Sequence, residues 1–218
     1  MDTKGGESYY AYGGSILLND VIVYFHLLFV AIGLGIAVRL DFIFFRGRHA
    51  RPSQVLLADT ALSHQMISTA LVGLWGTGIC LVYLRTGFVL SEFSPKLWVK
   101  LIIVTMLSCN AIIIGMFVMP VLERYNDRPV LAIPLRYKLP MAMSAATSAF
   151  SWFTALALGA MATLKTQSWG TLGAVFGLEF LVGMMVAISL ALWARASKPP
   201  PKPEAPAETP LKVASETN

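Results

Sequence analysis

Four ionisable residues lie inside apolar stretches of the sequence that are long enough to cross a bilayer: His26, His64, Lys100 and Glu179. An ionisable side chain at membrane depth is costly unless it is paired or hydrated, so such residues mark ion paths, proton relays or ligand sites. Imidazole can bind a metal or haem iron, while an amine and a carboxylate can relay protons or hold charged groups. The sequence therefore offers candidate chemistry, provided that the helices bring these residues together.

Apolar residues are concentrated in five blocks of membrane-spanning length. The 218-residue chain is 56% hydrophobic and 13% charged, whereas soluble domains average about 45–50% apolar and about 25% charged residues. The blocks are continuous rather than alternating, which favours helices over barrel strands, and helices satisfy their own backbone hydrogen bonds in lipid. The sequence predicts an all-α polytopic bundle over residues 16–196, with spans at roughly 16–45, 60–84, 97–121, 140–164 and 171–194.

The basic residues gather in the first and third loops and in the tail, and basic loops stay cytoplasmic. We therefore expect the N-terminus outside and the C-terminus inside, in a bacterial inner membrane, with basic charge that orients the chain rather than binding nucleic acid. Residues 1–15 form an outer segment without the pattern of a cleaved signal peptide. The Pro-rich residues 197–218 are predicted to be a disordered cytoplasmic tail.

Depth along each span separates the four ionisable residues into two groups. From the helical rise, His26 lies about 7 Å, Lys100 about 13 Å and Glu179 about 5 Å outward of the span centres. His64 lies about 12 Å inward, near Asp59. The two histidines are thus about 20 Å apart in depth, so they cannot both ligate one haem iron, whose ligand bonds are about 2 Å long.

Each of these residues has more than one interpretation. His26 either bonds a neighbouring helix or serves as a ligand, and Gly33 on the same helix face would leave room for a flat cofactor. Lys100 can extend toward the interface. The Glu179 side chain is too short to do so. A pair with Lys100, a hydrogen bond to His26 or protonation would lower the free-energy cost of placing its carboxylate in the membrane. For His64 we expect a structural role.

Small residues and sulfur-containing residues also require interpretation. Gly173 with Gly177, and Ala31 with Gly35, form small-xxx-small pairs that favour helix packing within the chain or a homodimer. Cys80 and Cys109 are expected to be small buried residues rather than a disulfide or metal pair. The methionine pairs are either gap-fillers or soft ligands for Cu(I); they are Met116 and Met119, Met141 and Met143, and Met184 and Met185.

Two short stretches resemble known membrane proteins. Phe25-His26-Leu27-Leu28, followed by Ala31-Ile-Gly33-Leu-Gly35, is similar to the histidine-plus-glycine first helix of the copper-resistance protein D membrane domain and of HemJ-type protoporphyrinogen oxidases. Leu97-Trp98-Val99-Lys100-Leu101 is similar to their lysine-bearing later helix. The resemblance implies that His26 and Lys100 are linked to haem binding and activity. Gly115 stands where those families offer a further histidine.

The first hypothesis is therefore an integral inner-membrane protein, haem-associated or redox-linked, with a haem b site in the outer half of the membrane. His26 would be the metal ligand beside Gly33, and Lys100 and Glu179 would act as catalytic residues that meet propionates or relay protons. The alternatives are a transporter or permease-like component, with copper carried past Glu179 and the methionines, and a non-catalytic accessory subunit. The last would contact a membrane redox partner or a second copy through the glycine pair. No hydrolase, nucleotide-binding or metalloprotease motif decides whether the chain is an enzyme.

Overall fold

A computed structural model describes the backbone of residues 4–196 and the side chains of residues 16–193. Helices make up nearly all of this range, and it contains no strand. The tail predicted over 197–218 lies outside the described residues. The helices are α1 (Lys4–Gly47), α2 (Gln54–Thr86), α3 (Pro95–Ile113), η2 (Ile114–Val118), α4 (Met119–Arg124), α5 (Leu135–Ala160) and α6 (Trp169–Ala196), with short 3-10 turns η1 (Leu90–Glu92), η3 (Val130–Ala132) and η4 (Ala162–Thr166).

Five segments of the described chain are long and apolar enough to cross a membrane, which confirms the predicted all-α polytopic class. They are Ile16–Gly47, Gln54–Thr86, Pro95–Arg124, Leu135–Ala160 and Trp169–Trp193. The third combines α3, η2 and α4 into one continuous span.

Two predicted span boundaries were wrong, and helix-capping chemistry explains the difference. The second span begins six residues early, at Gln54, because the Ser53 hydroxyl accepts the Leu56 backbone N–H at 3.1 Å and caps the helix. The fourth begins at Leu135 rather than 140, since Pro134 lies just before the helix and ends the preceding loop. Lys138, which the sequence placed in a basic loop, is consequently a buried residue of α5.

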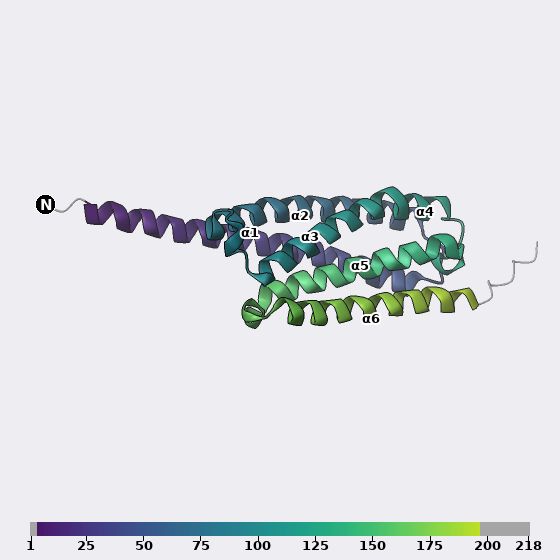
Figure 1. Ribbon diagram of the computed structural model, residues 1–218. Coiled ribbons are helices and arrows are strands. Elements are labelled where there is room, and N and C mark those ends of the chain that lie inside the picture. Colours follow the sequence, from purple (N-terminus) through teal and green to yellow (C-terminus); the bar gives the residue numbers. More distant parts are fainter. Residues whose placement is uncertain (1–3, 197–218) are drawn as a thin grey trace, which may run out of the picture.

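The helices run up and down in one bundle (Figure 1). α1 packs along α2, α5 packs against α6, and α3 and α1 both contact α5. The N-terminal turns of α1 project past the other helices, and α1 starts at the end of the bundle opposite to the end where α6 finishes (Figure 1). The odd number of spans therefore separates the two ends of the described chain, while the inside-or-outside assignment stays a prediction.

Large apolar side chains cover the outer surface of the bundle. Val72 and Met116 are 73% and 77% exposed, and many other leucine, valine and phenylalanine side chains are similarly uncovered. A water-soluble monomer rarely exposes apolar patches of this extent, whereas lipid solvates them at no cost. The chain is therefore an integral membrane protein in contact with the bilayer.

Some small residues lie where the sequence did not place them. Gly35, Gly173 and Gly177 face open space, since a Cβ at each would meet no atom within 4 Å. The small-xxx-small pairs consequently do not mediate packing within the chain. Cys80 and Cys109, expected to be buried, are free and exposed on the lipid-facing surface.

A reciprocal pair of hydrogen bonds joins α3 to α5 in the buried centre. The Asn110 side-chain amide donates to the Ser144 carbonyl at 3.0 Å, and the Ser144 hydroxyl donates to the Asn110 side-chain oxygen at 2.8 Å. Both residues are buried. The pair satisfies polar groups that lipid cannot, and so it fixes the register of these two helices.

We expect a double-mutant cycle with Asn110→Ala and Ser144→Ala to give a coupling free energy between about 0.6 kcal/mol, the average measured for hydrogen bonds between membrane helices, and about 1.7 kcal/mol, the largest measured. Unfolding of the purified protein in detergent measures it. Thr147→Val is the matched control, because the Thr147 hydroxyl donates only to its own helix, at the Met143 carbonyl. Additive effects of the two substitutions would contradict the pairing.

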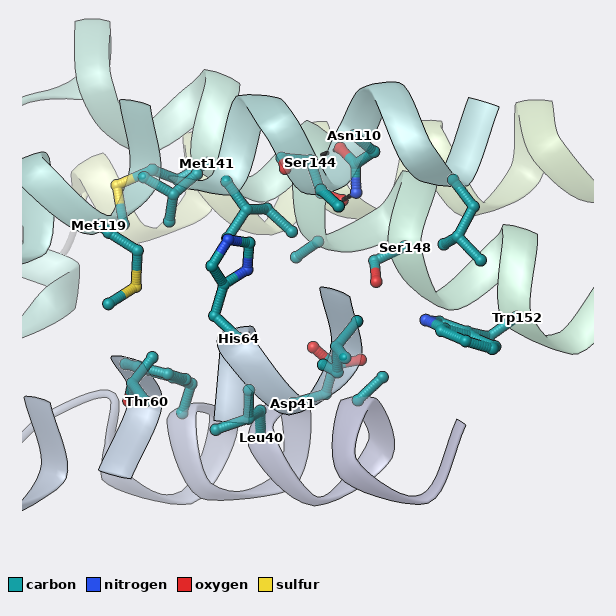
Figure 2. A pocket seen from close by; sticks show the side chains of 18 of the residues that line it. Leu40, Asp41, Thr60, His64, Asn110, Met119, Met141, Ser144, Ser148 and Trp152 are labelled. Atoms are coloured by element: carbon teal, nitrogen blue, oxygen red, sulfur yellow. Dashed lines mark hydrogen bonds between the residues drawn. The ribbon is translucent and has the colours of Figure 1, made fainter. Parts of the chain in front are cut away.

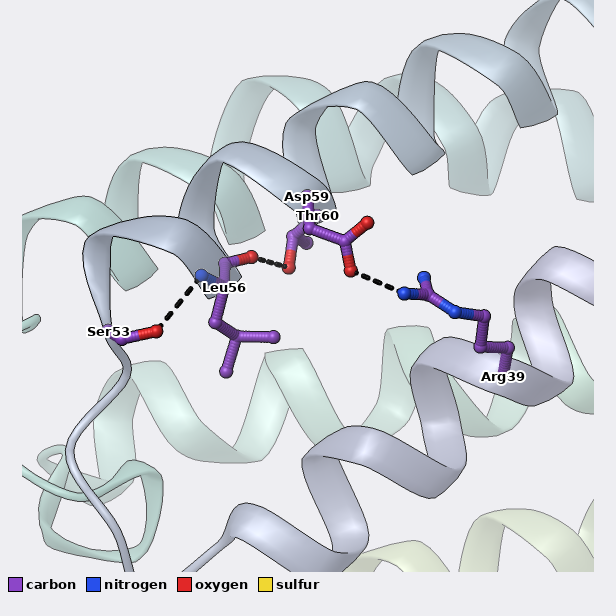
Figure 3. Close-up of polar contacts among 5 residues, drawn as sticks. All are labelled: Arg39, Ser53, Leu56, Asp59 and Thr60. Carbon is purple, nitrogen blue, oxygen red and sulfur yellow. Dashed lines mark hydrogen bonds and ion pairs between the residues drawn. The ribbon is translucent and has the colours of Figure 1, made fainter.

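At the end of the bundle that is predicted to face inward, α1 and α2 are linked by a single ion pair (Figure 3). Arg39 donates to the Asp59 carboxylate at 2.8 Å, and both side chains are partly exposed. Thr60, beside Asp59, donates instead to the Leu56 carbonyl of its own helix. An exposed pair of this kind contributes little stability, but it neutralises both charges near the end of the spans.

The connection between α4 and α5 closes the same end. Arg128 donates two hydrogen bonds to Asp127, and its guanidinium holds the pKa of that carboxyl below its usual range. The Leu131 backbone N–H donates to the Arg48 carbonyl at 3.4 Å, while the Leu131 carbonyl accepts the Lys138 amine at 3.0 Å. This loop therefore fixes the buried end of α5.

Candidate functional site

His26 of α1 is held by a hydrogen bond that determines its tautomer. Its Nδ1 lies 2.9 Å from the Thr77 hydroxyl of α2, and that hydroxyl donates to the Gly73 carbonyl at 2.7 Å. A hydroxyl carries one proton, so Thr77 accepts from Nδ1–H of His26. Nε2 of the neutral ring is then left with a free lone pair. Metal-ligating histidines are held in this way, by donating their other ring nitrogen to a fixed partner.

Of the three residues predicted to share the outer half, the structure brings two into one region. Lys100 and Arg85 are the cationic groups within electrostatic range of His26. Glu179 lies elsewhere: it is exposed and faces a groove between α1, α5 and α6 that includes neither His26 nor Lys100. The predicted pairing of Glu179 with Lys100 or His26 is not found among the described residues.

The space beside Gly33 is already filled by a flat group. A Cβ at Gly33 would overlap the six-membered ring of Trp152, which reaches across from α5. A cofactor held by His26 would therefore not use Gly33 as its opening. On the α2 side, a Cβ at Gly78 would lie at ordinary contact distance, 3.5 Å, from Cε1 of His26. The imidazole fits a ligand role, whereas Gly33 instead accommodates the indole.

The separation of the two membrane histidines agrees with the sequence prediction. His26 of α1 lies level with Thr77 of α2, because the two side chains are hydrogen-bonded. His64 is also on α2, thirteen residues before Thr77. At the helical rise this is about 20 Å, so the described chain cannot supply both to one iron.

His64 faces an internal cavity of about 120 Å³ enclosed by α1, α2, α5 and the third span (Figure 2). A structural role was expected for His64, and no cavity around it was predicted. Polar and sulfur-bearing side chains from all four spans line this cavity: Asp41, Thr60, His64, Asn110, Met119, Met141, Ser144, Ser148 and Trp152.

A π-helical turn, η2, forms part of the cavity wall. Pro120 follows it and has no N–H to donate to the Met116 carbonyl, which favours a widened turn at this place. Within η2, Gly115 faces His64, and a Cβ there would lie 3.0 Å from Nε2 of the ring. Single π-helical turns in α-helices are frequent at functional sites. Gly115 therefore provides the space that the imidazole of His64 requires.

Trp152 is a buried donor without an acceptor. It is 1% exposed, and its Nε1 has no hydrogen-bond partner among the described residues. Figure 2 shows the indole nitrogen turned toward the part of the cavity that holds Ser148 and Asp41. Neither the Asp41 carboxylate nor the His64 ring has a partner within the described part of the chain. Unpaired buried donors are rare, so this one points to a group that the cavity accommodates.

The cavity adjoins a larger lateral groove of about 870 Å³. Apolar residues of α1, α5 and α6 line the groove, together with the ionisable residues Asp41, Lys138 and Glu179. The side chains that line both spaces are Asp41, Phe44, Val118, Leu122, Met141 and Ala145. The cavity thus borders a groove that opens on the lipid-facing side of the bundle.

The methionines divide between the cavity and the lipid surface. Met119 and Met141 line the cavity, whereas their predicted companions Met116 and Met143 are exposed. Within the described residues, no three histidine, cysteine or acidic side chains gather into a metal site. The copper hypothesis therefore stays a prediction, with these two methionine pairs each split between two environments.

Comparison with protein-family models, curated proteins and solved structures finds no match.

Proposed function

We propose that this integral membrane protein is haem-associated and redox-linked, with His26 as the axial ligand of a haem b. The main support is the hydrogen bond that His26 Nδ1–H donates to the Thr77 hydroxyl. The hydroxyl accepts this bond because it donates its own proton to the Gly73 carbonyl. That arrangement leaves Nε2 free and the ring fixed inside a membrane span. The resemblance of this helix and of the Lys100 segment to HemJ-type proteins supports the same assignment.

Four residues would take part in holding the group. Nε2 of His26 would bind the iron, and Thr77 would hold the ring orientation and tautomer. Lys100, with its neighbour Arg85, supplies positive charge near His26 that suits propionate groups. A bound haem would supply one-electron chemistry. The other predicted catalytic residue, Glu179, has its place in the groove and is assigned no role at His26.

The test is the absorption spectrum of the full chain purified from haem-replete cells. We expect a Soret band that His26→Ala abolishes, and haem affinity about 10–100-fold weaker in Thr77→Val, as for other residues that orient a ligating histidine. Thr77→Ser, which keeps the hydroxyl, retains the affinity of the unmodified protein.

His49→Ala is the matched histidine control, because His49 lies in the exposed turn between α1 and α2. It is expected to leave the Soret band unchanged. A colourless preparation would overturn the proposal, and so would a band that survives in His26→Ala but disappears in His64→Ala. Co-purification of such a colourless chain with a larger complex would favour the accessory-subunit alternative.

A further inference from the structure

The cavity at His64 and the lateral groove lie side by side and share six lining residues. Both are lined mostly by apolar side chains, but the cavity of about 120 Å³ also carries a cluster of polar groups, among them Asp41, His64 and Trp152, whereas the groove of about 870 Å³ carries few. Ala145 and Met141 of α5 lie at the junction and line both. A molecule that occupies both parts needs a small polar head and a long apolar tail.

The polar groups at the cavity restrict the charge of that head. The unpartnered Nε1–H of Trp152 requires an acceptor, which an ammonium group does not offer. The Asp41 carboxylate, which lines the same cavity, disfavours an anionic head such as a fatty acid. The head is therefore a neutral group that accepts hydrogen bonds, such as a carbonyl oxygen.

The size of the two spaces restricts the shape of the ligand. An apolar cavity of about 150 Å³ takes one benzene molecule, so the smaller space of about 120 Å³ excludes a phospholipid headgroup and takes one edge of a ring, whose remainder must extend toward the groove. The groove runs beside α5 and α6 from Lys138 to Glu179 and suits an extended chain. A ring with carbonyl oxygens and an isoprenoid chain has both properties.

We propose that this space binds an isoprenoid quinone, with the ring between His64 and Trp152 and the tail in the groove. A carbonyl oxygen accepts the Trp152 Nε1–H, and the imidazole of His64, which Gly115 leaves room for, lies on the other side of the ring. The ligand enters sideways from the bilayer, past Ala145. This site is separate from the one at His26 and does not depend on haem binding.

The experiment is calorimetric titration of decylubiquinone into the full chain in phosphatidylcholine nanodiscs, with protein-free nanodiscs measuring partition into lipid. We expect saturable binding of one quinone per chain. Trp152→Phe, which keeps an aromatic ring but removes the donor, is expected to weaken binding about five- to tenfold, as the loss of one hydrogen bond implies. Ala145→Phe closes the junction and is expected to abolish saturable binding.

Ala174→Phe is the matched control, because Ala174 is exposed on α6 and lines neither space. It is expected to bind quinone like the unmodified chain. Circular dichroism and size-exclusion chromatography establish whether each variant is folded. If Trp152→Phe does not fold, the binding measured with Ala145→Phe tests the proposal instead. If the unmodified chain gives no more heat than quinone partition into protein-free nanodiscs, lipid or water fills the space and the proposal is overturned. Equal quinone affinity in Ala145→Phe and in the unmodified chain also overturns it. Since the readout is heat rather than a haem band, a colourless chain that binds quinone refutes only the function proposed for His26.

Discussion

Replacing Trp152 with alanine is expected to lower the free energy of unfolding by about 3 kcal/mol, as truncation of a fully buried aromatic residue does. Trp152 is 1% exposed and packs in a core cluster with Val30, Leu71, Leu74 and Leu107. Helix association in lipid depends on van der Waals packing. Without the indole, these neighbours lose the atoms that they contact, and with them the dispersion energy. Denaturant titration of the purified protein in detergent micelles measures the change.

Trp193→Ala is the matched control for this truncation. Trp193 is 61% exposed near the end of α6, so its removal is expected to change stability by less than about 0.5 kcal/mol. If the two tryptophan variants lost the same stability, the indole of Trp152 would not hold α5 against α1.

Gly33→Leu is expected to destabilise the protein by about 1–3 kcal/mol, the usual cost of inserting atoms into a packed core. The new side chain must displace the Trp152 indole, because its Cβ alone would overlap three ring atoms of the indole. The same unfolding titration applies. In a Trp152→Ala background the cost is expected to fall, because the leucine then enters the space that the indole vacated.

Gly35→Leu supplies the comparison on the same helix two residues away. A Cβ at Gly35 meets nothing within 4 Å, and leucine is a better helix former than glycine, so stability is expected to stay constant or rise by about 1 kcal/mol. Equal losses at both glycines would show that helix flexibility, and not the contact with Trp152, sets the cost.

The number of spans, the helical class and the relative depth of the histidines could be predicted from the sequence. Hydrophobic length determines a span, and the rise per residue then determines depth, which is why His26 and His64 were correctly separated.

Rotation about each helix axis could not be predicted in the same way. Glu179 faces the groove between α1, α5 and α6 because α6 packs on α5. Gly33 was identified as an opening, yet the residue that fills it is 119 positions away on another helix. Hydropathy carries little information on helix facing in lipid, since both the packed and the lipid-facing sides are apolar. Pro120 was the one local signal for the irregular turn beside His64.

That irregular turn lets the third span hold one residue more than a regular helix of the same length. A π-helical turn closes its hydrogen bonds five residues apart instead of four, so the extra residue is absorbed within residues 114–118 and the later side chains keep their direction. A deletion of one residue there that restored a regular helix would therefore leave Met119 and Leu122 at the cavity, and Ile103 and Leu107 with their neighbours. The change would fall on the turn itself, where Gly115 faces His64. The surroundings of His64 can thus change in one turn of helix while the rest of the span stays in register.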